Sequence, residues 1–431
     1  MSKFDPSISN VEFKNDILSF MISGSESYGL DKSMINCIRR TILTDIPTVA
    51  FRVDENTKKD IHVNENTGSI HNEMILQRIS LVPLYIDPQN YKNNYLFELK
   101  VKHDTDNTYK FITSEDINIY PLLPKLQNKI DNLDEDEVDS ELEDILNSKN
   151  IDNYDFKNNI SKKQKDNIFR PFIFKNTKNY CLITELKNTN TADTNQSIHL
   201  YGVPSLSTGM ENSRYQSVSL VTYSFTKDED LINSIIADRI SLDDVPPENQ
   251  ELFAKKIHLS ESERYYKRDM ENEPYSYEFS IKSCHYYSAG EIFLKSINII
   301  IDKLDHLKLQ FLNLLKDKES SISVEKNNDI IFKINIHNEG HTIGNLIQGH
   351  LSRRCIYDDS MFLTCGYKKV HPLEDWIKLT ISLNPSHKII KETEANKFQM
   401  MITSLMEEIE VLKQEFKSIL KVSESSEIIK E

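Results

Sequence analysis

Histidine and cysteine are the side chains here best able to bind a metal or carry out nucleophilic chemistry. His337 and His341 are four residues apart, but a predicted strand end and turn separate them, and no Glu-x-x-His partner lies nearby. His371 precedes a proline, which is typical of a turn. The five cysteines, at positions 37, 181, 284, 355 and 365, stand singly without CxxC spacing. No Walker loop, GxSxG elbow or paired-aspartate polymerase motif occurs, so we expect no catalytic, metal-binding or cofactor-binding residue.

The adjacent Arg39 and Arg40 suit the chemistry of interfaces. Consecutive helical residues point about 100° apart. One guanidinium can therefore reach a partner subunit while the other binds local carboxylates or helix C-termini. Two solvated arginines are the alternative interpretation.

Glycines indicate close packing near the end of the chain. Gly340 permits a tight approach before a helix, and Thr342 can cap that helix. Gly344 lies inside the helix, where it costs about 1 kcal/mol of helix propensity, so another segment is expected to approach its backbone. Gly366 sits in a strand pattern, where glycine often marks a bulge or a close approach. The apolar stripe of this helix is Ile343, Leu346, Ile347 and Leu351.

Composition limits the class of protein. The 431 residues allow two or three domains with sizeable cores. The net charge of -15 argues against broad binding to a phosphate backbone, so strong nucleic-acid binding is not expected. No apolar run of about 18 residues could span a membrane, and residues 1–10 lack a signal-peptide core. Single cysteines favour free thiols in a reducing compartment.

Hydrophobic periodicity predicts the elements that position these residues. Alternating apolar residues predict strands at 18–22, 277–281, 330–336 and 377–383. Helices follow these strands, including a short one at 72–81 and long ones at about 289–316 and at the C-terminus. Two strand-helix-strand-helix units thus bracket an insert with strand-like pieces at 95–101, 173–184 and 217–225.

An acidic tract within the insert, residues 131–144, holds nine Asp or Glu residues and no Lys or Arg. Self-repulsion and scarce apolar area predict a disordered loop near 131–166. A docking site for a basic partner is the alternative.

The two long helices each carry an apolar seam with alternating steps of four and three residues. The seams are Phe293, Ile297, Ile300, Leu304, Leu307, Phe311 and Leu314, and Phe398, Ile402, Leu405, Ile409, Leu412, Phe416 and Ile419. Such a seam requires a helical partner or a packed core. Three interpretations stay open: each helix covers its own sheet, the two pair or share a joint core, or a seam forms an intermolecular coiled coil.

Five segments together resemble the alpha-like subunits of eukaryotic and archaeal DNA-dependent RNA polymerases. Residues 35–48 (INCIRRTILTDIPT), 71–84 (HNEMILQRISLVPL) and 209–218 (GMENSRYQSV) resemble the larger alpha-like subunit. Residues 340–346 (GHTIGNL) and 365–374 (CGYKKVHPLE) resemble the smaller one. The resemblance implies that two subunits are fused in one chain.

The resemblance implies an α+β fold, an intramolecular pseudo-dimer with a β-rich domain inserted in its first half. The expected divisions are 1–86 plus 276–317 for the larger alpha-like half, 87–275 for the insert, 318–329 for a linker and 330–431 for the smaller half. In some relatives the insert binds zinc or an iron–sulfur cluster through cysteines. Here 87–275 contains only Cys181, so no cysteine-ligated site of that kind is expected.

The implied function is that of a non-catalytic assembly platform for a multisubunit RNA polymerase. Expected partners are the two largest subunits and small zinc-bearing subunits, with the chain itself a monomer. Expected subunit-interface residues are Asn36, Arg39, Arg40, Glu73, Arg78 and Pro83. Expected pseudo-dimer residues are Phe293, Ile297, Leu304, Phe311, Gly340, His341, Thr342, Gly344, Asn345, Leu346, Gly366, Tyr367, Leu405 and Leu412.

The fusion resembles the polymerases of large nucleocytoplasmic DNA viruses. That likeness implies action in the cytoplasm or nucleus of a host cell and packaging in the virion. A stand-alone coiled-coil adaptor is the alternative from a different class. A histidine-dependent hydrolase is a third, and it would need an acid/base pair that the sequence does not show.

Overall fold

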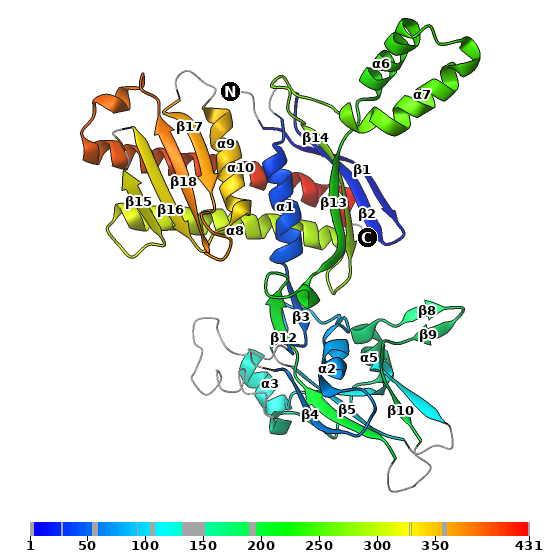
Figure 1. The fold of residues 1–431 in the computed structure, drawn as a ribbon. Helices are drawn as coiled ribbons and strands as arrows, with labels where there is room; N and C mark the ends of the chain where they lie inside the picture. The colour runs from blue at the N-terminus through cyan, green and yellow to red at the C-terminus, as the bar shows by residue number, and fades with distance from the viewer. Residues whose placement is uncertain are drawn as a thin grey trace. The chain divides into compact units, whose positions relative to one another are not determined.

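The computed structural model describes residues 4–26, 29–53, 59–92, 94–103, 108–131, 151–188, 195–326, 328, 330–355 and 360–429. The chain divides into two compact units. Unit 1 comprises Met1–Asp45, Val218–Ser283 and Ser288–Glu431, and unit 2 comprises Ile46–Ser217 and Cys284–Tyr287. Helices accompany antiparallel sheets in both units, which confirms the α+β class (Figure 1).

The first half of unit 1 is a four-stranded sheet in the order β1-β2-β14-β13. Its strands are β1 (Ser7–Lys14), β2 (Ile17–Ser23), β14 (Ser276–Ser283) and β13 (Val218–Phe225). Alternate residues Leu18, Phe20 and Ile22 are buried, as the period of a half-buried strand predicts. Helix α1 (Lys32–Thr44) follows β2, and α8 (Ala289–Leu315) follows β14. A capping box between Ser288 and Glu291 fixes the start of α8.

The second half of unit 1 has the matching sheet order β15-β16-β18-β17. The strands are β15 (Ile322–Lys326), β16 (Ile331–His337), β18 (Trp376–Leu383) and β17 (Phe362–Lys368). Helix α9 (His341–Arg354) joins β16 to β17, and α10 (Glu394–Ser425) ends the half. The same strand-and-helix order thus occurs twice, as the sequence predicts.

Two details of the second half differ from expectation. The predicted linker 318–329 contains β15, which pairs with β16 as an edge strand, because Ile322 and Val324 alternate with polar residues. Thr342 does not cap α9. The N-cap is Gly340, which has no side chain to accept a hydrogen bond.

A helical hairpin interrupts the first half between β13 and β14. Helices α6 (Glu229–Leu242) and α7 (Pro247–Glu261) share a small core of Ile232, Ile236 and Ile257. Figure 1 shows the hairpin standing away from the sheet that carries it. The sequence did not separate this hairpin from the insert, because its connecting segments are as polar as the rest of that region.

Unit 2 is built on a four-stranded sheet in the order β4-β11-β5-β7. These strands are β4 (Ile61–Asn66), β11 (Ser197–Gly202), β5 (Tyr95–Lys102) and β7 (Ile117–Pro121). Two-stranded sheets accompany it, formed by β3 (Pro47–Ala50) with β12 (Ser205–Thr208) and by β6 (Tyr109–Thr113) with β10 (Leu182–Lys187). The helices are α2 (Asn72–Ser80), α3 (Pro124–Asp131) and α5 (Lys162–Phe169).

The boundaries of unit 2 differ from the expected insert 87–275. Strand β3 pairs with β12, and β4 pairs with β11, so the chain enters unit 2 directly after α1. At the other end, β13 pairs with β14 in the sheet of unit 1. Both boundaries depend on pairing between strands that are distant in the chain. The hydrophobic periodicity of a single segment does not reveal such pairing.

The expected disordered loop 131–166 is only partly within the described chain. Residues 132–150 lie outside it. The remainder contradicts the expectation, because α5 begins at Lys162 and Tyr154 is buried in a small core. The expected strand piece 173–184 is also wrong as a single element. It contains β8 (Phe172–Phe174), β9 (Thr177–Asn179) and part of β10.

Across the described residues, no helix is long and apolar enough to cross a membrane. The same residues contain no group of three or more His, Cys, Asp or Glu side chains placed to hold a metal ion. All five cysteines are free thiols.

Candidate assembly interface

The two long helices of unit 1 pack against each other in antiparallel orientation. Lys308 Nζ of α8 lies 2.8 Å from Glu410 Oε2 of α10, and Lys413 of α10 pairs with Asp305 of α8. Residue numbers rise along one helix as they fall along the other, which defines the orientation. The predicted seam residues Phe293, Ile297, Leu304, Phe311, Leu405 and Leu412 are all buried. The open question about the seams is thus answered by pairing within the chain.

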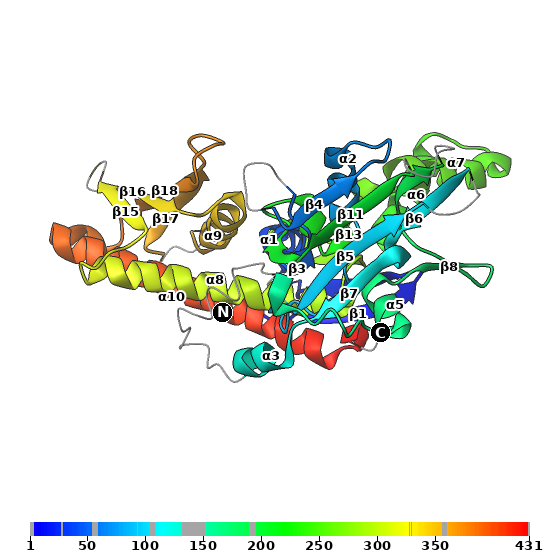
Figure 2. The same ribbon diagram turned by 90° about the horizontal axis from the view of Figure 1, so that it is seen from below.

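Each long helix also reaches the sheet of the other half. Helix α8 contacts β2 and β14 of its own half and β15 of the second. Helix α10, which belongs to the second half, contacts β1 of the first. At the far end of the pair, a Cβ on Gly290 would clash with the backbone oxygen of Ile428. The two halves therefore exchange helices, and Figure 2 shows α8 and α10 running side by side along the unit.

A second contact between the halves joins α1 to α9. Arg40 Nε donates to Thr342 Oγ1 at 2.9 Å, and Arg353 of α9 donates to the Gly29 carbonyl at 2.8 Å. A Cβ on Gly349 of α9 would lie 2.7 Å from Ser33 Oγ on α1. The two helices thus meet closely, and glycine at 349 makes the approach possible. Lys303 joins the same region, because its Nζ lies 2.7 Å from Asp45 Oδ2.

Glu339 lies at this contact between the halves. Burial raises the pKa of its carboxyl, the Lys303 ammonium offsets part of that rise, and Asp45 adds to it. Lys303 is a residue of the first half, whereas Glu339 precedes α9 in the second. The Glu339 carboxyl, whose protonated form is favoured, therefore lies where the two halves meet.

Within the second half, the segments 340–346 and 365–374 are in direct contact. A Cβ on Gly344 would lie 2.6 Å from the Tyr367 ring, so only glycine leaves room for that ring. His341 Nδ1 lies 3.3 Å from the Tyr367 hydroxyl. Leu346 is buried and Asn345 is half-buried on the same helix. No atom comes within 4 Å of a Cβ placed on Gly366, so the close approach expected there is absent.

A buried polar cluster between α9 and α10 was missed in the sequence. His350 Nε2 lies 3.0 Å from Glu408 Oε2, which also accepts from Arg354 Nε at 3.0 Å. Glu415 Oε2 lies 3.8 Å from His350 Nδ1. The signal lay in α10, where Glu408 and Glu415 are seven residues apart and so share one face.

The expected subunit-interface residues take two kinds of position. Arg39 donates to Asn36 Oδ1 one turn earlier on α1, and Glu73 is exposed on α2. Arg78 instead donates to the Ile183 carbonyl of β10 at 3.0 Å, which ties α2 to a strand of unit 2. Pro83 is half-buried. Two apolar side chains of the same region, Met74 and Leu81, are 51% and 68% exposed.

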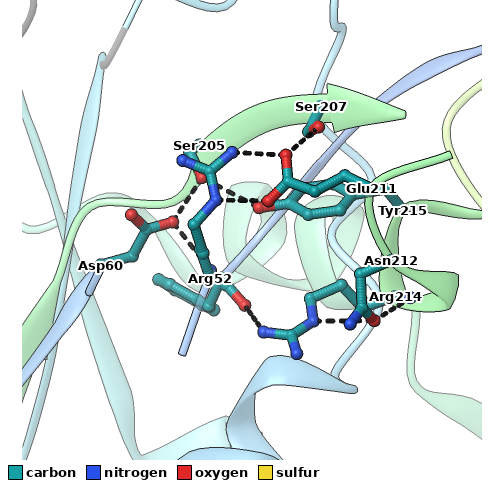
Figure 3. Close-up of polar contacts among 9 residues, drawn as sticks. Arg52, Asp60, Ser205, Ser207, Glu211, Asn212, Arg214 and Tyr215 are labelled. Atoms are coloured by element: carbon teal, nitrogen blue, oxygen red, sulfur yellow. Dashed lines mark hydrogen bonds and ion pairs between the residues drawn. The ribbon is translucent and has the colours of Figure 1, made fainter. Parts of the chain in front are cut away.

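The segment 209–218 is held in unit 2 by a polar network (Figure 3). Arg52 makes a bidentate pair with Glu211, with distances of 2.5 and 2.7 Å. Asp60 accepts from the Arg52 backbone amide at 2.8 Å and from Ser205 Oγ at 2.5 Å. The Tyr215 hydroxyl lies 2.9 Å from Ser205 Oγ. Glu211 and Tyr215 of the segment are thus tied to Arg52 and Ser205 elsewhere in unit 2.

Comparison with known proteins decides the family. The profile of the RNA polymerase Rpb3/Rpb11 dimerisation domain matches residues 27–304, and a second profile of the same description matches residues 332–415. The chain belongs to this family. The first match covers the first half of unit 1 together with unit 2, and the second match lies in the second half of unit 1. The chain is thus a fusion of two alpha-like subunits that form a pseudo-dimer.

Curated relatives match shorter stretches of the chain. The DNA-directed RNA polymerases I and III subunit rpac1 of Dictyostelium discoideum is 24% identical over 129 residues, which are 26% of this chain and 35% of that protein. The human subunit RPAC1 is 29% identical over 80 residues, 19% of each chain. The Rpo3 subunit of Methanosphaera stadtmanae is 28% identical over 102 residues, 21% of this chain and 35% of that protein. The matches span about a third or less of these relatives.

Proposed function

We propose that this chain is the assembly platform of a multisubunit DNA-directed RNA polymerase and holds its two largest, catalytic subunits. The supporting observation is the pair of dimerisation domains joined through exchanged helices in unit 1. In this proposal the chain performs no chemistry itself. Its net charge of -15 suits protein contacts better than contacts to nucleic acid.

The surfaces that would bind the large subunits are the outer faces of α1 and α2. Met74 on α2 exposes an apolar side chain next to the exposed Glu73, and Leu81 exposes another at the C-cap of the helix. On α1, Arg39 is half-buried against Asn36 and has no carboxylate among the ion pairs of the described residues. The sequence also predicts that Arg40 contacts a partner subunit. In the structure Arg40 donates to Thr342 of the same chain, so its contact with a partner remains a prediction. Small zinc-bearing subunits are proposed to dock alongside.

Co-expression with the two largest subunits of the same polymerase tests the proposal. We expect one stoichiometric complex, and loss of about tenfold or more in capture when Met74 and Leu81 are both changed to Asp. Leu259→Asp is the matched control, because Leu259 on α7 is 90% exposed and belongs to neither surface. Circular dichroism melts should be unchanged in both variants. Failure of the unmodified chain to bind either large subunit refutes the proposal.

The adaptor alternative loses its main support in the structure. The seams of α8 and α10 cover each other, with Leu304 and Leu405 fully buried, so neither seam is open to a helix of another protein. Because the two subunits are fused, we further propose a source in a large nucleocytoplasmic DNA virus, action in the host cytoplasm or nucleus, and packaging in the virion. Mass spectrometry of purified virions would test the packaging.

A further inference from the structure

The β8–β9 hairpin of unit 2 exposes apolar side chains that nothing in the described chain covers. Phe172, Ile173 and Phe174 are three consecutive residues, and their side chains are 70%, 64% and 57% exposed. Every residue of both strands is exposed. The hairpin stands out beyond the neighbouring strands of its unit in both views (Figure 1, Figure 2). Contiguous exposed apolar surface of this kind marks an interaction site.

The hairpin has a tight turn, and its base is bonded to α5. Lys175 and Asn176 have φ angles of 46° and 62°, the left-handed pair that a tight two-residue turn requires. At its base, Ile168 and Phe169 of α5 are buried in the core of unit 2. Asp166 of α5 accepts hydrogen bonds from Lys178 and from the Tyr180 hydroxyl, both at 2.5 Å. A partner would therefore meet a preformed surface and would not have to order a loop.

The two sides of the hairpin are different. Successive side chains of a strand point to opposite faces, so Phe172 and Phe174 share one face and Ile173 lies on the other. Lys178 pairs across the hairpin with Ile173 and reaches back to Asp166, so this second face is turned toward α5. The face of Phe172 and Phe174 carries only Asn179 and Thr177 across from the two rings. It is the side available to a partner.

The net charge around the hairpin is positive, whereas that of the whole chain is negative. Residues 161–185 contain six cations and two carboxylates, Asp166 and Glu185, whereas the whole chain carries -15. The Lys175 ammonium lies 5.4 Å from the centre of the Phe174 ring, beside the exposed aromatic face. A partner suited to this surface combines bulky apolar side chains with acidic ones.

We propose that the β8–β9 hairpin is a docking site for an extended, acidic protein segment with bulky apolar side chains. The segment covers Phe172 and Phe174, and its carboxylates face Lys175. This inference rests on the proposed function, which supplies the partner as another protein of the polymerase. Each strand of the hairpin pairs only with the other in the described chain, so an open edge remains for main-chain pairing.

A nucleic-acid strand fits the surface less well. Such a ligand needs a row of cations that neutralises successive phosphates. Here Lys178 is already paired with Asp166, and the Arg170 guanidinium lies 4.2 Å from the centre of the Tyr85 ring. Lys175 alone remains beside the two exposed rings. Apolar area dominates over charge, which favours a protein segment.

Photocrosslinking in the assembled polymerase tests the proposal. Phe172 is replaced by p-benzoylphenylalanine in the full chain, the complex with the two largest subunits is purified and irradiated, and adducts are mapped by mass spectrometry. We expect an adduct within a segment of another protein that is rich in Asp or Glu. The same replacement at Leu373, which is 87% exposed on the second half, is the control and should not label that segment.

The segment so identified is then made as a peptide and its affinity for the full chain is measured. Phe172→Ser with Phe174→Ser should weaken binding about tenfold or more, and Lys175→Glu should weaken it in a salt-dependent way. Melts should not change, because these side chains are exposed. An adduct with nucleic acid, an adduct only with this chain, no adduct, or a peptide insensitive to these variants overturns the inference. Failure of the unmodified chain to form the complex instead refutes the proposed function.

Discussion

Replacing Gly344 by alanine tests the packing of α9 on β17 through two effects of opposite sign. Alanine in a helix interior is favoured over glycine by about 1 kcal/mol. The added Cβ, however, would lie 2.6 Å from Cδ2 and 3.0 Å from Cγ of the Tyr367 ring, closer than atoms of this kind pack. The ring must therefore move to accommodate the methyl group.

The size of the net effect follows from how firmly the ring is held. The Tyr367 backbone amide donates to Gln348 Oε1 at 3.0 Å, and the hydroxyl lies 3.3 Å from His341 Nδ1. Overpacking of a held side chain costs about 1–3 kcal/mol. After the gain in helix propensity is subtracted, we expect Gly344→Ala to lower the free energy of unfolding by about 0–2 kcal/mol.

Because that net value can be small, the decisive measurement is a double-mutant cycle. Urea unfolding is followed by the fluorescence of Trp376, the single tryptophan, which lies on β18 of the same half. In a Tyr367→Ala background the clash is gone, so Gly344→Ala should stabilise by about 1 kcal/mol. Gly349→Ala is the control, since its Cβ faces Asp31 and Ser33 of α1 and should not couple to Tyr367. Equal stabilisation by Gly344→Ala in both backgrounds refutes the contact.

Three further predictions concern the union of the halves. A protease site inserted after Lys318 should yield two fragments that stay together in gel filtration, whereas separate folded fragments would contradict the pseudo-dimer. Leu304→Asp, at a fully buried position of α8, should destabilise by about 4 kcal/mol or more and expose both halves to protease, while Leu309→Asp, at a position 51% exposed on the same helix, should be nearly neutral. Burial raises the pKa of Glu339 in the folded state, so the wild type loses stability as pH rises from the ordinary glutamate pKa to the raised one. Glu339→Gln has no such loss, so its stability relative to the wild type should increase across that pH range. A difference in melting temperature that does not change with pH would show that the carboxyl is solvated.

Sequence periodicity predicted two kinds of element: those whose partners are close in the chain, and those with a strong hydrophobic repeat. The strands through Leu18 and Ile377 and the long helix α8 lie where alternation and heptad spacing place them. The division between the units was not predicted, because it depends on β3 pairing with β12 across the whole of unit 2. The helix α5 was missed for a related reason. Its two buried apolar residues, Ile168 and Phe169, do not indicate a helix by themselves. Their role is clear only once the core in which they are buried is known.

The interface residues show the same limit. Gly344 inside a helix indicated a close approach of another segment, and the structure places the Tyr367 ring there. The sequence pattern could not say which arginine would contact the other half, and Arg40 donates to Thr342 there. Nor could it show Lys303 or His350, which act through partners more than fifty residues away in the chain. Residue type indicates that a side chain needs a partner, and the fold decides which one.

The exchange of helices explains why the two halves would be joined in one chain. Helix α10 contacts β1 of the first half, and α8 contacts β15 of the second, so each half completes its core with a helix that the other provides. As separate polypeptides the halves would expose these seams until they met. A short connection between α8 and β15 keeps them at roughly millimolar effective concentration, so pairing follows synthesis directly. Unit 1 then completes its core without a second chain.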